Sequence, residues 1–193
     1  MLALAALLLL AAEPAAAAPA AATAEREMLD GLKAACDRAG DIEAMKADAA
    51  AAGWEPMAED AEPRIAKLNK LGREAVDAEG KIAGGNFRRT IGGREMFLIV
   101  SRYDDKTGFW GAGCRIYDFA ATEPFDPKAA EAWMGKPPTG VQTPGPGLSR
   151  RLWEPGWRDG ITLEVSHVPQ GHELGEKYGL SGNVLVAQAI GGF

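Results

Sequence analysis

The chain of 193 residues carries 21 basic and 27 acidic side chains, a formal net charge of −6, and 47% of its residues are hydrophobic. This composition is typical of one globular domain, and a chain of this length buries roughly 70% of its unfolded surface without depending on a metal or many disulfides. The mildly acidic balance lacks the basic excess of a general nucleic-acid binder or of a protein bound to an anionic membrane. We therefore expect no nucleic-acid partner.

The first 24 residues have the pattern of an export signal. Residues 2–12 form an unbroken run of 11 Leu and Ala residues, which is too short to cross a bilayer core of about 30 Å but has the size of a signal-peptide core. The small residues Ala22-Thr23-Ala24 predict cleavage before Glu25, and an earlier cut among residues 15–18 fits the same rule. We expect residues 1–24 to be a signal peptide and residues 25–193 to be a single domain in the periplasm or outside the cell.

The rest of the chain offers no candidate for a membrane span. Its longest apolar run is Met96-Phe97-Leu98-Ile99-Val100, and a spanning helix requires about 20 residues of this kind. The mature chain is therefore predicted to have no membrane-spanning segment.

The first third of the mature chain has helical patterns. Residues 25–39 carry an apolar stripe every fourth residue and stop at Gly40, a residue that suits the end of a helix. Asp41 can cap a second helix through residue 52, and Gly53-Trp54-Glu55-Pro56 then interrupts the chain. A third helix is predicted over residues 62–78, with a proline in its first turn.

From residue 86 the apolar pattern becomes alternating, which is typical of strands. Residues 86–91 and 94–102 flank Gly92-Gly93, a two-residue connection that allows the positive φ of a tight hairpin. A turn near residues 103–108 leads into a third strand over residues 109–119. We expect these three strands to form an antiparallel meander.

The second half of the chain adds a helix and three further strands. Asp126-Pro127 predicts a short helix that ends at Gly135, and residues 137–147 are too rich in proline and glycine for regular structure. The strand candidates that follow are residues 148–153, 160–168 and 183–190. The predicted fold is therefore α+β, with the order ααα-βββ-α-βββ, an antiparallel sheet of about six strands and helices covering one face of it.

The two cysteines of the chain, Cys36 and Cys114, are predicted to form a disulfide. Met28, Leu32 and Cys36 recur every fourth residue and share a helix face, while strand alternation places Cys114 on an apolar face. An exported protein with an even number of cysteines favours a bridge. Two buried free thiols and a single reactive cysteine remain as alternatives.

The only two histidines, His167 and His172, lie close together within a segment that ends at Glu176. Two His and two Glu residues within this segment have the donor types of a zinc site or of a base with an orienting carboxylate. The histidines are five residues apart across Pro169 and Gly171, which differs from the spacing of the known helical zinc motif. We predict no metal and no cofactor, and take His167 as a residue at the edge of the core.

Two surface features are candidates for binding. The first is a group of arginines on or beside strands, which can gather guanidinium groups into a site for a carboxylate or phosphate; its members are Arg88, Arg89, Arg94, Arg150 and Arg151. The second is Trp153-Glu154-Pro155-Gly156-Trp157, in which two indoles bracket a turn. Exposed indoles here would form an aromatic platform for a glycan, a peptide or a protein partner, and the alternative is that they pack in the core against the end of the sheet.

From these features we expect an exported domain that acts by binding or as an accessory component of the cell envelope. The residues singled out for binding are Arg150, Arg151, Trp153, Trp157 and His172. No catalytic residue is assigned, because the sequence has no phosphate loop, dinucleotide fingerprint or nucleophile elbow. The alternatives are a small exported hydrolase or lyase that uses the His167–Glu176 segment, and a structural envelope protein.

Overall fold

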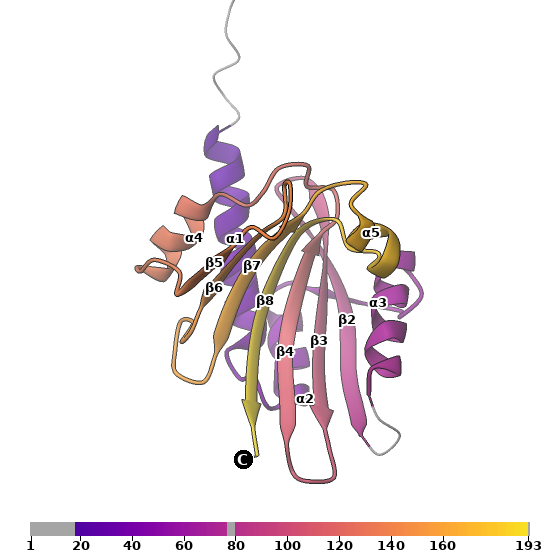
Figure 1. Ribbon diagram of the computed structural model, residues 1–193. Helices are drawn as coiled ribbons and strands as arrows, with labels where there is room; N and C mark the ends of the chain where they lie inside the picture. The colour runs from indigo at the N-terminus through magenta and orange to yellow at the C-terminus, as the bar shows by residue number, and fades with distance from the viewer. Residues whose placement is uncertain (1–17, 77–79, 193) are drawn as a thin grey trace, which may run out of the picture.

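The computed structural model describes residues 18–76 and 80–192, which build eight strands and five helices into an α+β fold (Figure 1). Most of the predicted signal peptide, residues 1–17, lies outside this range. In chain order the elements are α1 (Ala18–Cys36), α2 (Ile42–Ala51), β1 (Glu55–Met57), α3 (Pro63–Glu74), β2 (Lys81–Ile91), β3 (Arg94–Asp104), β4 (Trp110–Asp118), α4 (Pro127–Met134), β5 (Gly140–Gln142), β6 (Ser149–Trp153), β7 (Thr162–Val168), α5 (Glu173–Tyr178) and β8 (Gly182–Gly191).

Several helices begin where the sequence places a capping side chain. The carboxylate of Asp41 accepts a hydrogen bond from the Ala44 amide at 3.0 Å at the start of α2. Glu62 and Asp126 have the same role at the starts of α3 and α4, each followed by a proline whose missing N–H would have no partner there. The local signals therefore place these three helix starts correctly.

One antiparallel sheet holds all eight strands, in the order β1-β2-β3-β4-β8-β7-β6-β5. The predicted hairpin at Gly92-Gly93 is confirmed: Ile91 pairs with Arg94, and the two glycines have φ values of 56° and 77°. A side chain would be strained at both positive φ values, which is why this turn uses glycine. The meander of β2, β3 and β4 is joined to β6, β7 and β8 by the pairing of β4 with β8. Strand β8 is the last strand of the chain.

The sheet is larger than the six strands predicted from the sequence. The two additional strands, β1 and β5, have three residues each and lie at the two edges of the sheet. Both lie in segments that contain or follow prolines, and the sequence pattern therefore indicates loops there. An edge strand tolerates proline, because one of its sides forms no hydrogen bonds with a neighbouring strand. The structure also has a fifth helix, α5, which begins directly after His172. Gly171, which interrupts regular structure, lies before the first turn of this helix.

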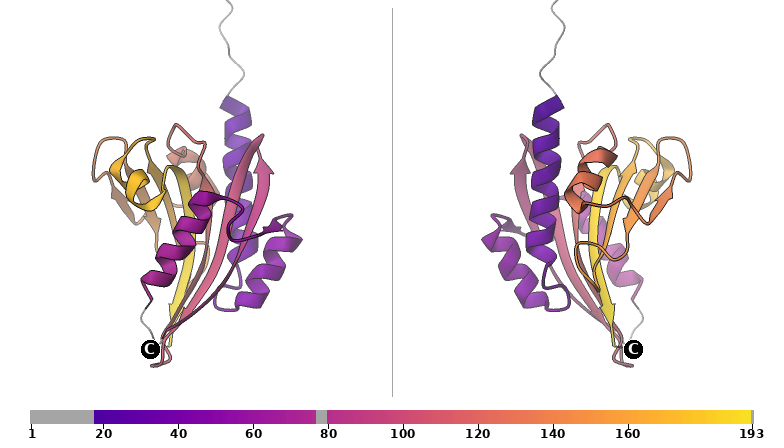
Figure 2. Two further views of the ribbon diagram at one scale, coloured as in Figure 1. Left: turned by 90° about the vertical axis from the view of Figure 1, so that its right-hand side faces the viewer. Right: turned by 90° about the vertical axis from the view of Figure 1, so that its left-hand side faces the viewer.

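Helices cover both faces of the sheet, and not one face as predicted. Figure 2 shows α1 and α2 on one side of the sheet and α3 on the other. The first side holds the larger core, in which Leu29 and Leu32 of α1 are packed with Leu98 and Ile116 of the sheet. The second side holds a smaller cluster around Ile65 of α3. The helical stripe of α3 correctly indicates that one of its sides is buried, but does not indicate which face of the sheet it packs against.

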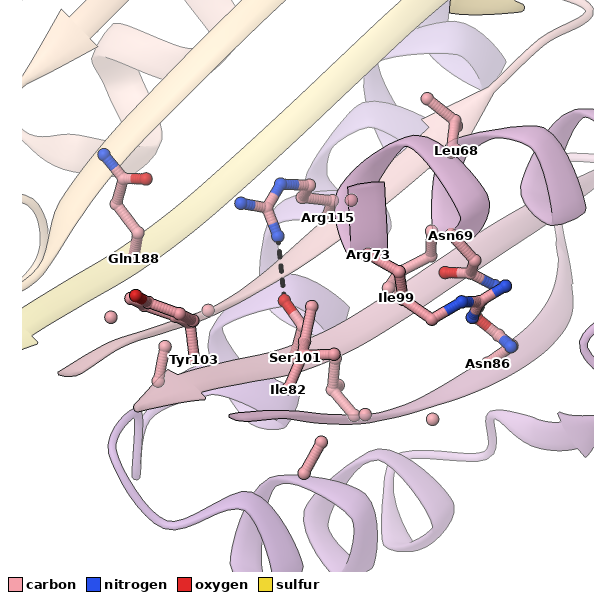
Figure 3. A pocket seen from close by; sticks show the side chains of 18 of the residues that line it. Leu68, Asn69, Arg73, Ile82, Asn86, Ile99, Ser101, Tyr103, Arg115 and Gln188 are labelled. Atoms are coloured by element: carbon pink, nitrogen blue, oxygen red, sulfur yellow. Dashed lines mark hydrogen bonds between the residues drawn. The ribbon is translucent and has the colours of Figure 1, made fainter. Parts of the chain in front are cut away.

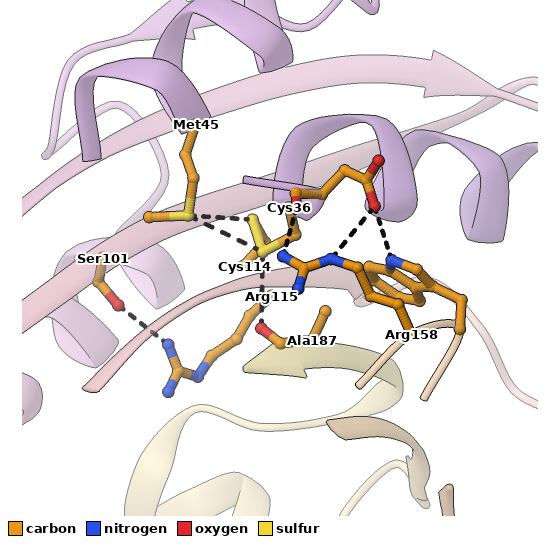
Figure 4. Close-up of a disulfide and its surroundings, with 9 residues drawn as sticks. Cys36, Met45, Ser101, Cys114, Arg115, Arg158 and Ala187 are labelled. Carbon is orange, nitrogen blue, oxygen red and sulfur yellow. Dashed lines mark hydrogen bonds and ion pairs between the residues drawn. A yellow bond between two sulfur atoms is a disulfide. The ribbon is translucent and has the colours of Figure 1, made fainter. Parts of the chain in front are cut away.

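The predicted disulfide between Cys36 and Cys114 is present and ties α1 to β4 (Figure 4). Both residues are fully buried, and the sulfur of Met45 on α2 lies 4.0 Å from each of the two cysteine sulfurs. The bond closes 78 residues of chain, which by loop entropy stabilises the fold by about 4 kcal/mol. A disulfide of this kind is compatible with a periplasmic or extracellular location.

Across residues 18–76 and 80–192, no helix combines the length and the apolar character that crossing a membrane requires.

Candidate functional site

Side chains on the α3 side of the sheet form three rows that cross four neighbouring strands. Because paired residues in a sheet lie side by side, the register of β2, β3, β4 and β8 defines each row. In strand order the rows are Asn86, Ile99, Arg115 and Val186; then Gly84, Ser101, Gly113 and Gln188; then Ile82, Tyr103, Gly111 and Ile190.

Glycines hollow out the middle of these rows. A Cβ atom at Gly113 would lie 2.3 Å from the Ala187 carbonyl oxygen, and one at Gly84 would lie 2.8 Å from the Val100 carbonyl oxygen. The backbones approach too closely there for any side chain. At Gly111 the only atom within 4 Å of an added Cβ is a methyl carbon of Ile190, at 3.8 Å. The floor of the site is therefore bare backbone between taller side chains.

Helix α3 lies over this floor and is held mainly by its first half. Ile65 is fully buried among aromatic and aliphatic side chains of the sheet, and the guanidinium of Arg64 lies 4.1 Å from the ring centre of Phe119. Farther along α3, the Asn69 side-chain amide donates a hydrogen bond to Asn86 on β2 at 3.0 Å. The second half of α3 contributes Asn69, Gly72 and Arg73 to the lining of the same cavity (Figure 3).

The space between α3 and the three rows is a cavity of about 630 Å³, which we call the trough. The larger aliphatic side chains that line it come from α3, from the residues that follow α3 and from the sheet, and include Leu68, Val76, Ile82, Ile99 and Ile190. Two of them, Ile82 and Ile190, keep 42% and 59% of their surface exposed and rank among the few large hydrophobic residues so exposed in the described chain. Cavities of this size that are lined mostly by apolar groups, with a few polar ones, are typical of small-molecule sites.

Three charged side chains line the trough within the described ranges: Glu59, Arg73 and Arg115. Glu59 and Arg73 form an ion pair with each other at the rim, where both side chains are about half exposed. The guanidinium of Arg115 donates a hydrogen bond from Nη1 to the Ser101 hydroxyl at 3.1 Å (Figure 3). Among the described residues that line the trough, Arg115 therefore leaves one positive charge without an opposite charge, inside a protein whose overall charge is negative.

Tyr117, next to Arg115 on the same face of β4, is the most deeply buried polar group beside the trough. Its burial raises the pKa of the phenol, and the positive charge of Arg115 acts in the opposite direction. The tyrosine ring stacks on Phe119, with ring centres 5.4 Å apart. Tyr117 thus contributes an uncharged aromatic wall at neutral pH.

Trp153 and Trp157, the candidate aromatic platform, do not share an exposed surface. Trp153 is fully buried in the larger core, and its indole N–H donates to the Lys136 carbonyl oxygen at 3.1 Å. Trp157 is partly buried, donates to Asp37 directly after α1 at 2.9 Å and meets Trp133 edge to face at 5.9 Å. Both indoles therefore have clear roles in joining loops and helices to the fold.

The predicted arginines are dispersed over the structure. Arg150 on β6 pairs with Glu164 on β7 at 2.6 Å, and this hydrogen bond raises the pKa of the arginine. Arg151 is the next residue of the same strand, so it points to the opposite face. Arg89 contacts Glu27 and Arg94 contacts Asp118, so the sheet does not gather these guanidinium groups into one site.

The two histidines have separate structural partners. His167 is buried, and its Nδ1 lies 2.9 Å from Asn183 Oδ1. His172 caps α5, where its Nδ1 accepts a hydrogen bond from the Leu174 amide at 3.2 Å. Neither lines the trough. Throughout the part of the chain that the structure describes, no three His, Cys, Asp or Glu side chains are grouped so that they could hold a metal ion.

Sequence reasoning missed the trough, although one local signal for it exists. Gly111 and Gly113 are two residues apart within β4, so both glycines fall on one face of the strand. Glycine inside a strand often marks a place where another group approaches the backbone closely. Arg115 continues that same face two residues later and was not among the arginines singled out.

Comparisons of this chain with protein-family models, with curated proteins and with solved structures gave no match. The chemical character of the trough is thus the basis on which a function can be assigned.

Proposed function

We propose that this protein is an exported binding protein that holds a small, largely apolar molecule in the trough. The observation that carries the proposal is the exposure of Ile82 and Ile190, 42% and 59%, on the walls of a 630 Å³ cavity with a glycine floor. Large aliphatic side chains in a monomer are normally exposed singly, and their convergence on a cavity favours a ligand that covers them.

The architecture supports binding in a further way. The larger core and the disulfide lie on the other side of the sheet, so the fold does not depend on filling the trough. The floor strands belong to a continuous ladder from β2 to β8, which makes the cavity preformed. A rigid, preformed site binds with a smaller loss of conformational entropy than a site that must fold around its ligand.

The proposal predicts saturable binding of an uncharged apolar dye. Nile red should bind the mature protein at one site with blue-shifted emission, and Gly111→Val should weaken binding by about tenfold or more, because the added side chain fills the floor. Ile190→Ser should weaken binding by a similar factor, since about 2 kcal/mol of apolar burial is lost. Fluorescence titration gives the dissociation constants.

Val141→Ser is the matched control, because Val141 is 58% exposed and lies on the edge strand β5, away from the trough. Circular dichroism and thermal unfolding would establish that each variant is folded. Binding that does not saturate, or equal affinity in wild type, Gly111→Val and Ile190→Ser, would contradict the proposal.

A further inference from the structure

The charge balance of the trough points to the chemistry of its ligand. Glu59 and Arg73 neutralise each other at the rim, which leaves Arg115 as the charged group without an opposite charge among the described trough residues. A cavity with apolar walls and one net positive charge favours a ligand with one negative charge.

The surroundings of Arg115 leave its guanidinium available. Its row neighbours on β3 and β8 are Ile99 and Val186, neither of which can pair with it. The next position of that row, on β7, is Glu164, and this carboxylate is already paired with Arg150 at 2.6 Å. Within the described residues the polar contact of Arg115 is the Ser101 hydroxyl at 3.1 Å, and a guanidinium has five N–H donors.

Two polar side chains lie close to Arg115, whereas the two most exposed aliphatic side chains of the trough lie farther from it. Ser101 and Gln188 lie in the row next to Arg115, so a hydroxyl and an amide flank the guanidinium (Figure 3). Ile82 and Ile190 lie in the row after that, on the far side of the glycine floor. A ligand that fits this order has a polar head on Arg115 and an apolar body that reaches Ile82 and Ile190.

Resting on the proposed binding function, we infer that the ligand is an amphipathic monocarboxylate whose head group is bound by Arg115 with help from Ser101 and Gln188. A planar carboxylate matches the fork of guanidinium donors and accepts two parallel hydrogen bonds from it. A phosphate monoester carries close to two negative charges at neutral pH, and one arginine with two neutral groups balances it less well.

The experiment compares ligands that share a decyl chain and differ in their head groups. Decanoate, decanol, decyl phosphate and decyltrimethylammonium would be titrated below their micelle concentrations, each displacing Nile red from the wild-type protein. Decanoate should bind about tenfold more tightly than decanol and also more tightly than decyl phosphate, because a charge-assisted hydrogen bond exceeds a neutral one. Decyltrimethylammonium should bind most weakly.

Arg115→Met keeps a long apolar stem and removes the charge. This variant should bind decanoate and decanol equally, while it retains the binding of Nile red and decanol. Arg151→Met is the matched control, since Arg151 lies on β6 outside the trough and its removal should leave the charge of the trough and the preference for decanoate unchanged. Arg115→Lys should keep part of that preference, because the ammonium retains the charge but not the planar fork.

The outcomes separate the two proposals. Binding of Nile red and decanol without any preference for decanoate, or a preference that survives in Arg115→Met, would overturn the assignment of Arg115 and leave the binding function intact. Tighter binding of decyl phosphate would replace the carboxylate by a phosphate ligand and overturn the inference as stated. Failure of every probe to bind would contradict the proposed function itself.

Discussion

Asp118 is a buried carboxylate at the end of β4, with no exposed side-chain surface. Its Oδ2 lies 2.8 Å from Nη2 of Arg94. Burial raises the pKa of Asp118, while the positive charge of Arg94 acts in the opposite direction, and burial is the larger effect. Ionised Asp118 is therefore less favourable in the folded chain than in the unfolded chain.

A raised pKa sets the sign of a pH dependence. The stability that protonated Asp118 contributes is fully present below the unfolded pKa of about 3.9 and is lost as the pH rises through the higher folded pKa. As the pH rises from the unfolded to the folded pKa of Asp118, we expect the unfolding free energy of Asp118→Asn to increase relative to that of the wild type. At higher pH the difference between the two proteins should stay constant. Urea unfolding of both proteins between acidic and neutral pH measures the difference.

Arg94→Met serves as the control for this prediction. Removing the positive charge should raise the pKa of Asp118 further and extend the pH range over which wild-type stability is lost. A wild-type protein that gains stability relative to Asp118→Asn with rising pH would mean that the ion pair outweighs burial.

Helix α1 extends across the predicted cleavage position. It begins at Ala18, and Ala24 is only 5% exposed because it packs on the turn at Gly92. A cut before Glu25 would remove this buried methyl group and the first turns of the helix. An earlier cut among residues 15–18, which fits the same small-residue rule, would keep α1 intact.

We expect the mature chain to start near residue 18, and a chain that starts at Ala18 to be about 1 kcal/mol more stable than one that starts at Glu25, from the buried methyl group alone. Intact mass of the exported protein gives the start, and urea unfolding of the two chains gives the difference. Ala24→Gly in the longer chain should reproduce part of the loss. An exported chain that begins at Glu25 with the same stability would rule this out.

The two faces of the sheet differ in how much hydrophobic core they carry. The face toward α1 and α2 carries the disulfide and the larger core, whereas the face toward α3 carries a smaller core and the trough. Two neighbouring residues of β3 lie on opposite faces: Leu98 belongs to the larger core and Ile99 to the smaller one. This arrangement places the disulfide and most of the core on the face opposite to the proposed binding site.

Leu98→Ala and Ile99→Ala should therefore have different effects. Leu98 is fully buried, and its truncation should cost about 3 kcal/mol or more of unfolding free energy with the affinity for Nile red unchanged. Ile99 borders the trough, so its truncation creates less new cavity and should cost roughly 2 kcal/mol while weakening dye binding. Urea unfolding and dye titration of both variants test this difference; equal effects on affinity would contradict it.

Local rules accounted for much of the fold. The capping residues Asp41, Glu62 and Asp126 act within their own first turns, and the Gly92-Gly93 hairpin depends only on the backbone freedom of two residues. The disulfide also follows from periodicity, because each cysteine lies on the apolar face of its own element. The sequence by itself therefore determined the class of fold, its main elements and the bridge.

The tertiary structure alone decided how the faces are used. An amphipathic helix such as α3 has a stripe that packs equally well on either side of a sheet, and the short edge strands depend on a neighbour for their ladder. The trough needs the register of β2, β3, β4 and β8, which brings Gly84, Ser101, Gly113 and Gln188 into one row although β8 lies at the other end of the chain. Arg115 became a candidate ligand-binding residue only through this pairing, because neighbours on other strands determine whether a guanidinium has a partner.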